Sequence, residues 1–220
     1  MHLIKGIGNT LLISALAIVL GIIFGMLAFA MRNSLFLDNS SSKMLRAIGK
    51  FFKGTGYVYV DVIRATPVVT QLLIIYFVIF ASVNINAIFV AVLAFGFNSG
   101  AYVSEIFRAG VQSIDKGQTE AGRSLGFSNL QTMFYIIIPQ AVKNVLPALA
   151  NEFIVLIKET AVVGYISIQD LTRGADIIRS LTFEPFLPLI AAAVIYYVII
   201  KFLTLAVSAF ERRLRSSDGP

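Results

Sequence analysis

The 220-residue sequence predicts an all-α integral membrane protein, a single domain over residues 1–220 with five membrane-spanning helices. Hydrophobic residues make up 57% of the chain and charged residues 14%, whereas an ordinary soluble domain has about 25% charged residues. The apolar residues form runs close to the length of about 20 residues that crosses the hydrocarbon core of a bilayer. Arg and Lys gather in alternate connectors, which predicts the orientation of each helix.

The first predicted span covers residues 11–31 and leads into a basic connector. Gly21 and Gly25 have the spacing that suits close packing against another helix, although membrane helices also tolerate isolated glycines. The connector sets five basic residues against Asp38: Arg32, Lys43, Arg46, Lys50 and Lys53. Because basic loops stay on the cytoplasmic side, we expect this connector inside the cell and the N-terminus outside.

The second predicted span, residues 56–80, is polar and broken. Asp61 and Arg64 lie inside it, directly before Thr66 and Pro67. Thr as N-cap and Pro as first residue would start a second half-helix of 16 residues, about 24 Å long, well inside the membrane. Helix N-termini favour anions, and discontinuous helices form substrate sites in transporters. The alternative is a simple proline kink whose free backbone groups are satisfied by neighbouring helices.

Two further predicted spans carry polar groups that lipid would not tolerate. Three residues on one face of the third span, 88–107, are spaced four and three residues apart: Asn98, Tyr102 and Glu105. The fourth span, 136–157, contains Glu152, and we expect Pro139 and Pro147 to interrupt it. Polar stripes on spanning helices face protein or a water-filled cavity, so these residues are candidates for a transport path.

The fifth predicted span, residues 186–210, ends in a basic tail and therefore places the C-terminus in the cytoplasm. The loop before it, residues 159–185, has no basic excess and is expected outside, with an interfacial helix over Thr172–Ser180. Lys201 lies within the fifth span, about ten residues before the basic tail, so its amine is near the limit of the distance over which it could reach the membrane surface. It is expected to pair with an acid on another helix.

A short polar stretch, Gln118–Gly126, lies in the cytoplasmic loop 108–135 and is expected to form a helix that Gly126 ends. It resembles the EAA signature of permease subunits of ABC importers: Glu-Ala-Ala, Gly four residues later, nine residues, then Ile-x-apolar-Pro. Five residues fall in register: Glu120, Ala121, Gly126, Ile136 and Pro139. Gly122 replaces the second Ala, which is expected to loosen the helix slightly.

Over nearly its whole length the chain is similar to five-span permeases of polar amino acid ABC importers. The stretches that carry the similarity are Gly8–Leu11, Val62–Pro67 with Gln71, Gly100–Arg108, Gln112–Ile114 with Lys116–Gln118, and Asn151–Phe153 through Lys158–Thr160. Ala65 departs from the Gly that is usual in the family, a change expected to stiffen the break. The resemblance implies the ABC importer permease fold in a prokaryotic cell (inner) membrane.

The resemblance also implies partners. A second permease copy or a paralogue would complete the path, with a homodimer expected, and an external binding protein would deliver the amino acid. Two copies of an ABC ATPase subunit would carry ATP and Mg²⁺ and dock on the coupling residues: Gln118, Glu120, Ala121, Gly122 and Gly126. This chain contains no GxxxxGK[ST] motif, so we expect it to bind no ATP in the P-loop manner.

Other function classes fit the sequence less well. The chain has no Cys, and its one His is His2 at the terminus, so we expect neither a metal site nor catalytic residues. The net charge of +6 is attributed to the cytoplasmic connectors, because no basic stripe lies on a polar face to suggest nucleic acid. A channel or a membrane enzyme would not explain the spacing from Glu120 to Pro139.

Seven residues are candidates for substrate binding: Asp61, Arg64, Thr66, Pro67, Asn98, Tyr102 and Glu152. The helix start at Thr66–Pro67, together with Arg64, suits the carboxylate of an amino acid, and Asp61 suits a cation. Glu152 favours a basic amino acid (arginine, lysine or histidine), since a charge pair at 4 Å and an effective dielectric near 20 gives about 4 kcal/mol before desolvation.

Three alternatives stay open for the substrate site. Glu152 pairs internally with Lys143, Lys158 or Lys201, or stays protonated. The substrate is a neutral polar amino acid such as glutamine, with specificity set only by the external binding protein. In the third alternative, the permease has no substrate site within the membrane.

Overall fold

The computed structural model describes residues 1–33 and 42–216, and every regular element within those ranges is helical, as predicted. Part of the basic connector, with Asp38, lies outside the described residues. The elements are α1 (His2–Arg32), α3 (Lys43–Ala65), α4 (Val68–Ile74) with a π-helical turn (Ile75–Ile79), α5 (Ala87–Gln112), α6 (Lys116–Ser124), α7 (Asn129–Thr132) with a second π-helical turn (Met133–Ile137), α8 (Ile138–Glu159), a 3₁₀ helix (Thr160–Ile166), α9 (Leu171–Thr182) and α10 (Leu187–Ser216).

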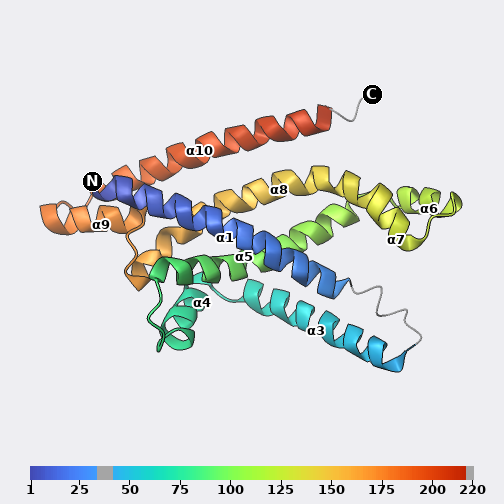
Figure 1. Ribbon diagram of the computed structural model, residues 1–220. Helices are drawn as coiled ribbons and strands as arrows, with labels where there is room; N and C mark the ends of the chain where they lie inside the picture. Colours follow the sequence, from blue (N-terminus) through green and yellow to red (C-terminus); the bar gives the residue numbers. More distant parts are fainter. Residues whose placement is uncertain (34–41, 217–220) are drawn as a thin grey trace.

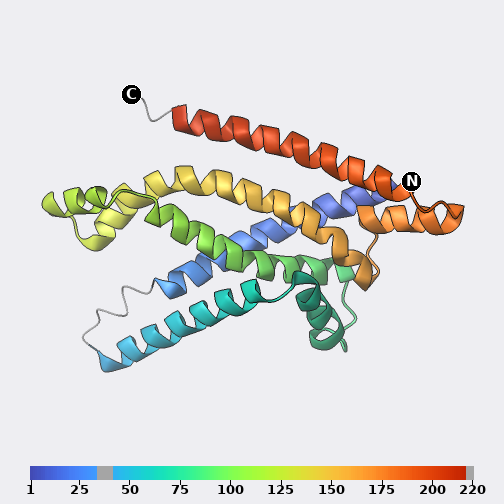
Figure 2. The same ribbon diagram turned by 180° about the vertical axis from the view of Figure 1, so that it is seen from behind.

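The long helices run lengthwise through the molecule, with α6 and α7 at one end and α9 at the other (Figures 1 and 2). Among the described residues, α1, α5 and residues 187–214 of α10 are each long and apolar enough to cross a membrane. The pair of α3 and residues 68–79 forms a further candidate span, bent by 109°. Helix α8 has 22 residues but carries four charged side chains. Five spans and the inside–outside orientation remain predictions.

The centre of the fold is the contact between α1 and α5. Gly21 and Gly25 of α1 lie against α5, where a Cβ on Gly25 would come within 2.5 Å of Val103 Cγ1 and a Cβ on Gly21 within 2.9 Å of Ser99 Oγ. Only glycine permits this approach, so the close-packing interpretation of the pair is confirmed. Phe95 of α5 is fully buried in the adjoining apolar core.

Helix α1 begins at His2, well before the predicted start at residue 11. Its polar first turns are fixed at the α9 end of the molecule. Asn9 Nδ2 donates to the Gln169 carbonyl at 2.9 Å, and Gln169 Nε2 donates to the His2 carbonyl at 3.1 Å. Hydropathy marks only the apolar part of a helix, so it does not reveal a polar extension that is held by tertiary contacts.

The break in the second span lies at Thr66–Pro67 as predicted, but its local assignment was wrong by one residue. Thr66 is the C-cap of α3, Pro67 is the N-cap of α4, and Val68 is the first helical residue. The second half ends at Ile79, short of the predicted 16 residues. Ala65 is the last residue of α3, where an alanine fits ordinary helical geometry.

The fourth predicted span is less interrupted than expected. Pro139 occupies the first turn of α8, where a backbone N–H is not needed, and Pro147 lies inside α8 without ending it. Thr172–Ser180 is helical as expected, within α9. Lys201 is exposed on α10 and forms no ion pair within residues 1–33 and 42–216, so the expected partner on another helix is not seen there.

Candidate functional site

The break at Thr66 is held by the side chain of Gln71, one turn into α4. Gln71 Nε2 donates to the carbonyls of Ile63 and Thr66, at 2.8 and 3.2 Å, and to Thr66 Oγ1 at 2.6 Å. The last carbonyls of a helix have no partner within it, and here the Gln71 amide supplies one. The 109° bend and the capping by Gln71 favour two separate half-helices over one helix with a simple proline kink.

Asn98 of α5 extends the same network. Its Nδ2 donates to Gln71 Oε1 at 2.8 Å, and the residue is only 2% exposed. Asn98 Oδ1 is buried and has no hydrogen-bond partner within the described residues. A buried acceptor without a donor costs about 1–3 kcal/mol. The network therefore presents one buried acceptor that the described residues leave unsatisfied.

Glu152 of α8 contacts Ser99, the residue that follows Asn98 on α5. Its Oε1 accepts a hydrogen bond of 2.8 Å from Ser99 Oγ, and Glu152 is 9% exposed. None of the salt bridges in the described part of the chain includes Glu152. The predicted alternative in which Lys143, Lys158 or Lys201 neutralises Glu152 is therefore not seen.

Three other predicted residues lie around a cavity, apart from Glu152 and the Gln71 network. Asp61, Arg64 and Tyr102 line a cavity of about 400 Å³ together with Arg32, Tyr57, Val60, Ala65 and Glu105. Asp61 and Arg64 are three residues apart on α3 and so share a face. The Arg64 guanidinium lies 5.4 Å from the centre of the Tyr102 ring, within the range of a cation–π contact.

The predicted site is thus divided along α5. Thr66 and Asn98 meet through Gln71, and Glu152 adjoins them through Ser99, whereas Tyr102 and Glu105 face the cavity. Glu105 follows Asn98 by seven positions, which corresponds to about 10 Å along the helix. Pro67 lies at the break.

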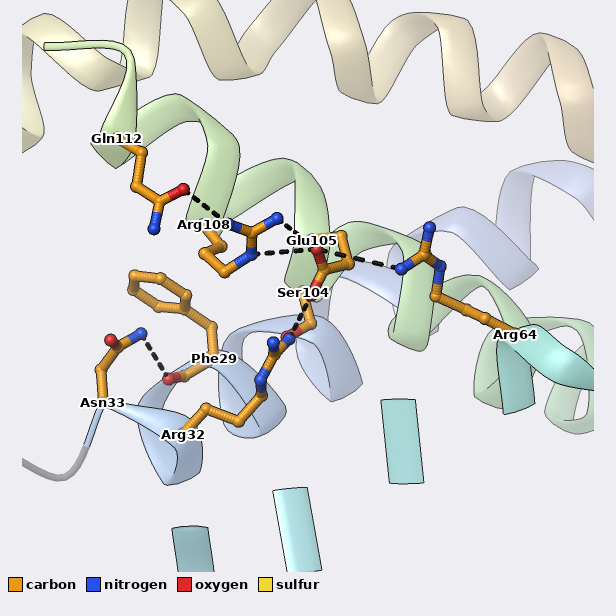
Figure 3. A network of polar contacts seen from close by, with 8 residues as sticks. All are labelled: Phe29, Arg32, Asn33, Arg64, Ser104, Glu105, Arg108 and Gln112. Atoms are coloured by element: carbon orange, nitrogen blue, oxygen red, sulfur yellow. Dashed lines mark hydrogen bonds and ion pairs between the residues drawn. The ribbon is translucent and has the colours of Figure 1, made fainter. Parts of the chain in front are cut away.

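Glu105 gathers three arginines from three helices (Figure 3). Its Oε1 pairs closely with Arg32 Nη1 at the end of α1. Its Oε2 accepts hydrogen bonds from Arg108 Nε and Nη2, at 2.9 and 2.6 Å, and lies 3.9 Å from Arg64 Nη1 at the end of α3. From the sequence, Arg32 is a loop cation and Glu105 is one of three residues on a polar face that are candidates for the transport path. That polar face is the available signal for Glu105, but it does not reveal the arginine partners.

The loop predicted to couple to an ATPase has the expected local structure. Asp115 caps α6 by accepting from the Gly117 amide at 2.6 Å, and Gly126 ends the segment with a φ of +87°. Ser128 and Gln131 then form a capping box at the start of α7. These elements are set by local chemistry, so the short helix and its stop are confirmed.

The coupling residues differ in exposure. Gln118, Glu120 and Ala121 are exposed on α6, whereas Gly122 is buried. A Cβ on Gly122 would lie 2.8 Å from Thr132 Cγ2 and 2.9 Å from Ile136 Cδ1. The missing side chain of Gly122 is what lets α6 approach Thr132 this closely. The expected slight loosening of the helix by Gly122 stays a prediction.

Comparisons with known proteins give one consistent picture. Residues 17–216 match the family described as "Binding-protein-dependent transport system inner membrane component". The chain is 38% identical to the arginine transport system permease protein ArtQ of Bacillus subtilis, with 98% of this chain and 94% of that one covered. It is 36% identical to the glutamine transport system permease protein GlnP of Escherichia coli, with 97% and 93% covered.

Solved structures agree. The chain resembles a structure of an amino acid ABC transporter with histidines at a TM-score of 0.83 and 43% identity, covering 96% of this chain and 94% of that one. It also resembles an inward-facing MetNI methionine ABC transporter at a TM-score of 0.74, over 96% and 95% of the two chains. The identity to the latter is 17%, so that likeness shows the fold alone.

Proposed function

The chain belongs to the family of binding-protein-dependent transport system inner membrane components, and on that premise we propose that it translocates basic amino acids. It is a multi-pass inner membrane protein, the permease subunit of an amino acid ABC importer, and is not itself an enzyme. Basic amino acids here means arginine, lysine and histidine, whose side chains carry or accept a positive charge.

The observation that carries the choice of substrate is that Glu152 is buried and forms no ion pair with the residues that the structure describes. A carboxylate in the membrane is costly to ionise unless it is paired, and its only described hydrogen-bond donor is the neutral hydroxyl of Ser99. A cationic substrate side chain would supply the missing charge. The arginine permease of B. subtilis and the transporter solved with histidines are consistent with this choice.

The main-chain groups of the amino acid have matching partners near the break. Asn98 Oδ1 is an unsatisfied buried acceptor that suits the substrate ammonium, and Asp61 offers a second anionic partner in the adjoining cavity. The substrate carboxylate would lie at Thr66–Pro67 and meet the guanidinium of Arg64. These assignments follow from charge and hydrogen-bonding chemistry.

A second candidate is a neutral polar amino acid such as glutamine. The relatives named glutamine permeases favour it, at 36% identity in E. coli and 35% in Rickettsia typhi. In that case Glu152 is protonated in the membrane and the external binding protein alone sets specificity.

The partners proposed for this permease follow from the family. Two ATPase subunits, which carry ATP and Mg²⁺, would dock on α6 through Gln118, Glu120, Ala121, Gly122 and Gly126. A second copy of this chain would complete the path as a homodimer, and an external binding protein would deliver the amino acid.

ATP-driven uptake in proteoliposomes tests the proposal. The permease is reconstituted with its ATPase and binding protein, and uptake of labelled arginine and glutamine is compared between wild type and Glu120→Ala. We expect arginine uptake in wild type, and in Glu120→Ala an assembled complex whose ATP hydrolysis no longer drives uptake. Glu184→Ala is the matched control, since Glu184 is a half-buried acid that follows α9, at the end of the molecule opposite α6. Normal uptake by Glu120→Ala would contradict the docking assignment.

A further inference from the structure

The three arginines around Glu105 differ in the number and length of their contacts (Figure 3). Arg32 has a side chain only 10% exposed, lies over the Tyr57 ring at 4.6 Å and pairs closely with Glu105 Oε1. Arg108 donates twice to Glu105 Oε2 and once more to Gln112 Oε1. Arg64 is 44% exposed and stays 3.9 Å from Glu105 Oε2, beyond hydrogen-bond distance. Arg64 is therefore the arginine that can leave Glu105 at least cost.

Arg64 is also the arginine nearest to the proposed path. It is the second-last residue of α3, and the break at Thr66–Pro67 follows directly. It lines the cavity with Asp61 and Tyr102. A carboxylate that arrives at the break presents Arg64 with the same chemical group that Glu105 offers, and planar guanidinium groups bind carboxylates through two parallel hydrogen bonds.

Departure of Arg64 would leave Glu105 well satisfied. Arg32 and Arg108 still pair with its two oxygens, one each, so no uncompensated carboxylate is created in the interior. Exchange of Arg64 between two carboxylates is therefore feasible without disrupting the junction of α1 and α5.

We propose that Glu105 is a positioning residue for Arg64. It holds the guanidinium beside the break until the carboxylate of an amino acid takes it over, and it receives Arg64 back when the substrate leaves. This inference rests on the proposed function, because it requires an amino acid site at the break. It adds that the substrate carboxylate competes with Glu105 for one arginine.

Competition of this kind has a signature that depends on the carboxylate. In Glu105→Gln the competing charge is gone, so ligands with a free carboxylate bind more tightly. Partly exposed ion pairs contribute up to about 1 kcal/mol, so we expect the Kd of arginine to fall about two- to fivefold. Argininamide has the same side chain and ammonium but no carboxylate, so its Kd should not fall.

The test is equilibrium binding of arginine and argininamide to the purified permease–ATPase complex without the binding protein. Asp176→Asn is the matched control, because Asp176 on α9 also pairs with two arginines, Arg173 and Arg179, each at 2.6 Å. That variant should bind both ligands as wild type does. Arg64→Gln should abolish the preference for arginine over argininamide, and adding Glu105→Gln to it should change neither Kd.

Each outcome decides one question. Equal changes for the two ligands in Glu105→Gln, or no change, would overturn the inference. Arg64→Gln tests it independently if Glu105→Gln does not assemble, and retained discrimination there would overturn it as well. Wild type that binds neither ligand would overturn the proposed intramembrane site, and this inference with it.

Discussion

Ser99 of α5 donates a hydrogen bond of 2.8 Å to Glu152 of α8, and both residues are buried between their helices. This contact fixes the carboxylate at Ser99, the residue that follows Asn98 on α5. A neutral hydroxyl orients a carboxylate but does not neutralise it. The contact therefore holds the Glu152 carboxylate in place, and the proposal of a basic substrate depends on it.

Glu152→Gln should weaken binding of arginine to the permease–ATPase complex by more than about tenfold, which corresponds to about 1.4 kcal/mol. The amide keeps the size of the side chain and its contact with Ser99 but removes the charge. Ser99→Ala is the graded control and should have a smaller effect, since it removes one hydrogen bond of about 0.5–1.5 kcal/mol. Unchanged affinity in Glu152→Gln would show that the carboxylate does not contact the substrate.

Gln71→Leu should destabilise the break. The Leu side chain leaves the carbonyls of Ile63 and Thr66 and the Asn98 amide without their partner, at a cost of about 1–3 kcal/mol. Thermal unfolding of the complex in detergent measures the loss. Gln140→Leu is the control, because Gln140 also donates to a backbone carbonyl but lies outside this network. A variant as stable as wild type would mean that the Gln71 amide is not needed to cap α3.

Gly122→Ala should impair coupling through a steric clash. The added methyl group meets Thr132, and overpacking of this kind costs about 1–3 kcal/mol. Substrate-stimulated ATP hydrolysis is the measurement. In a Thr132→Ala background the same Gly122→Ala change should cost less, because Thr132 Cγ2 and Oγ1 are gone and only the flexible end of the Ile136 side chain still meets the new methyl group. Equal losses in the two backgrounds would rule out this contact as the cause.

Asp170→Asn should change the pH dependence of stability. Asp170 is buried at the N-cap of α9, where it accepts from the Thr172 and Arg173 amides and faces the Tyr196 hydroxyl at 3.4 Å. Burial raises the pKa of its carboxyl above the usual 3.8. A raised folded-state pKa gives stability that is present at low pH and is lost as pH rises through it.

Asn keeps the capping oxygen and does not titrate. Thermal unfolding measured from acid to neutral pH should therefore show a steeper loss of stability with rising pH in wild type than in Asp170→Asn. Parallel curves for the two proteins would contradict a raised pKa at this position.

Features fixed by local chemistry could be predicted from the sequence. The break at Thr66–Pro67 and the stop at Gly126 depend on residues within one or two turns of the feature. Features fixed by distant contacts could not. Arg32 meets Glu105 across 73 residues of chain, and Ser99 meets Glu152 across 53. Periodicity places each residue on a face of its own helix but does not reveal which helix lies opposite.

For the same reason, the sequence did not reveal that the candidate site is divided into two parts. Asn98, Tyr102 and Glu105 share one face of α5, and their spacing suggested one polar stripe. The structure assigns Asn98 to Gln71 and Glu105 to the arginines, because α4 packs against one part of that face and the ends of α1 and α3 against another. The prediction that Pro147 interrupts the fourth span was wrong for a related reason, since neighbouring helices can stabilise a helix that proline alone would weaken.

The measurement that tests the central claim most directly is equilibrium binding of radiolabelled arginine to the purified permease–ATPase complex, without its binding protein. Lysine, histidine, glutamine and glutamate serve as competitors. A cation-selective site at Glu152 predicts saturable binding that lysine and histidine displace and glutamate does not. Absence of saturable binding, or displacement by glutamate as effective as by lysine, would contradict it.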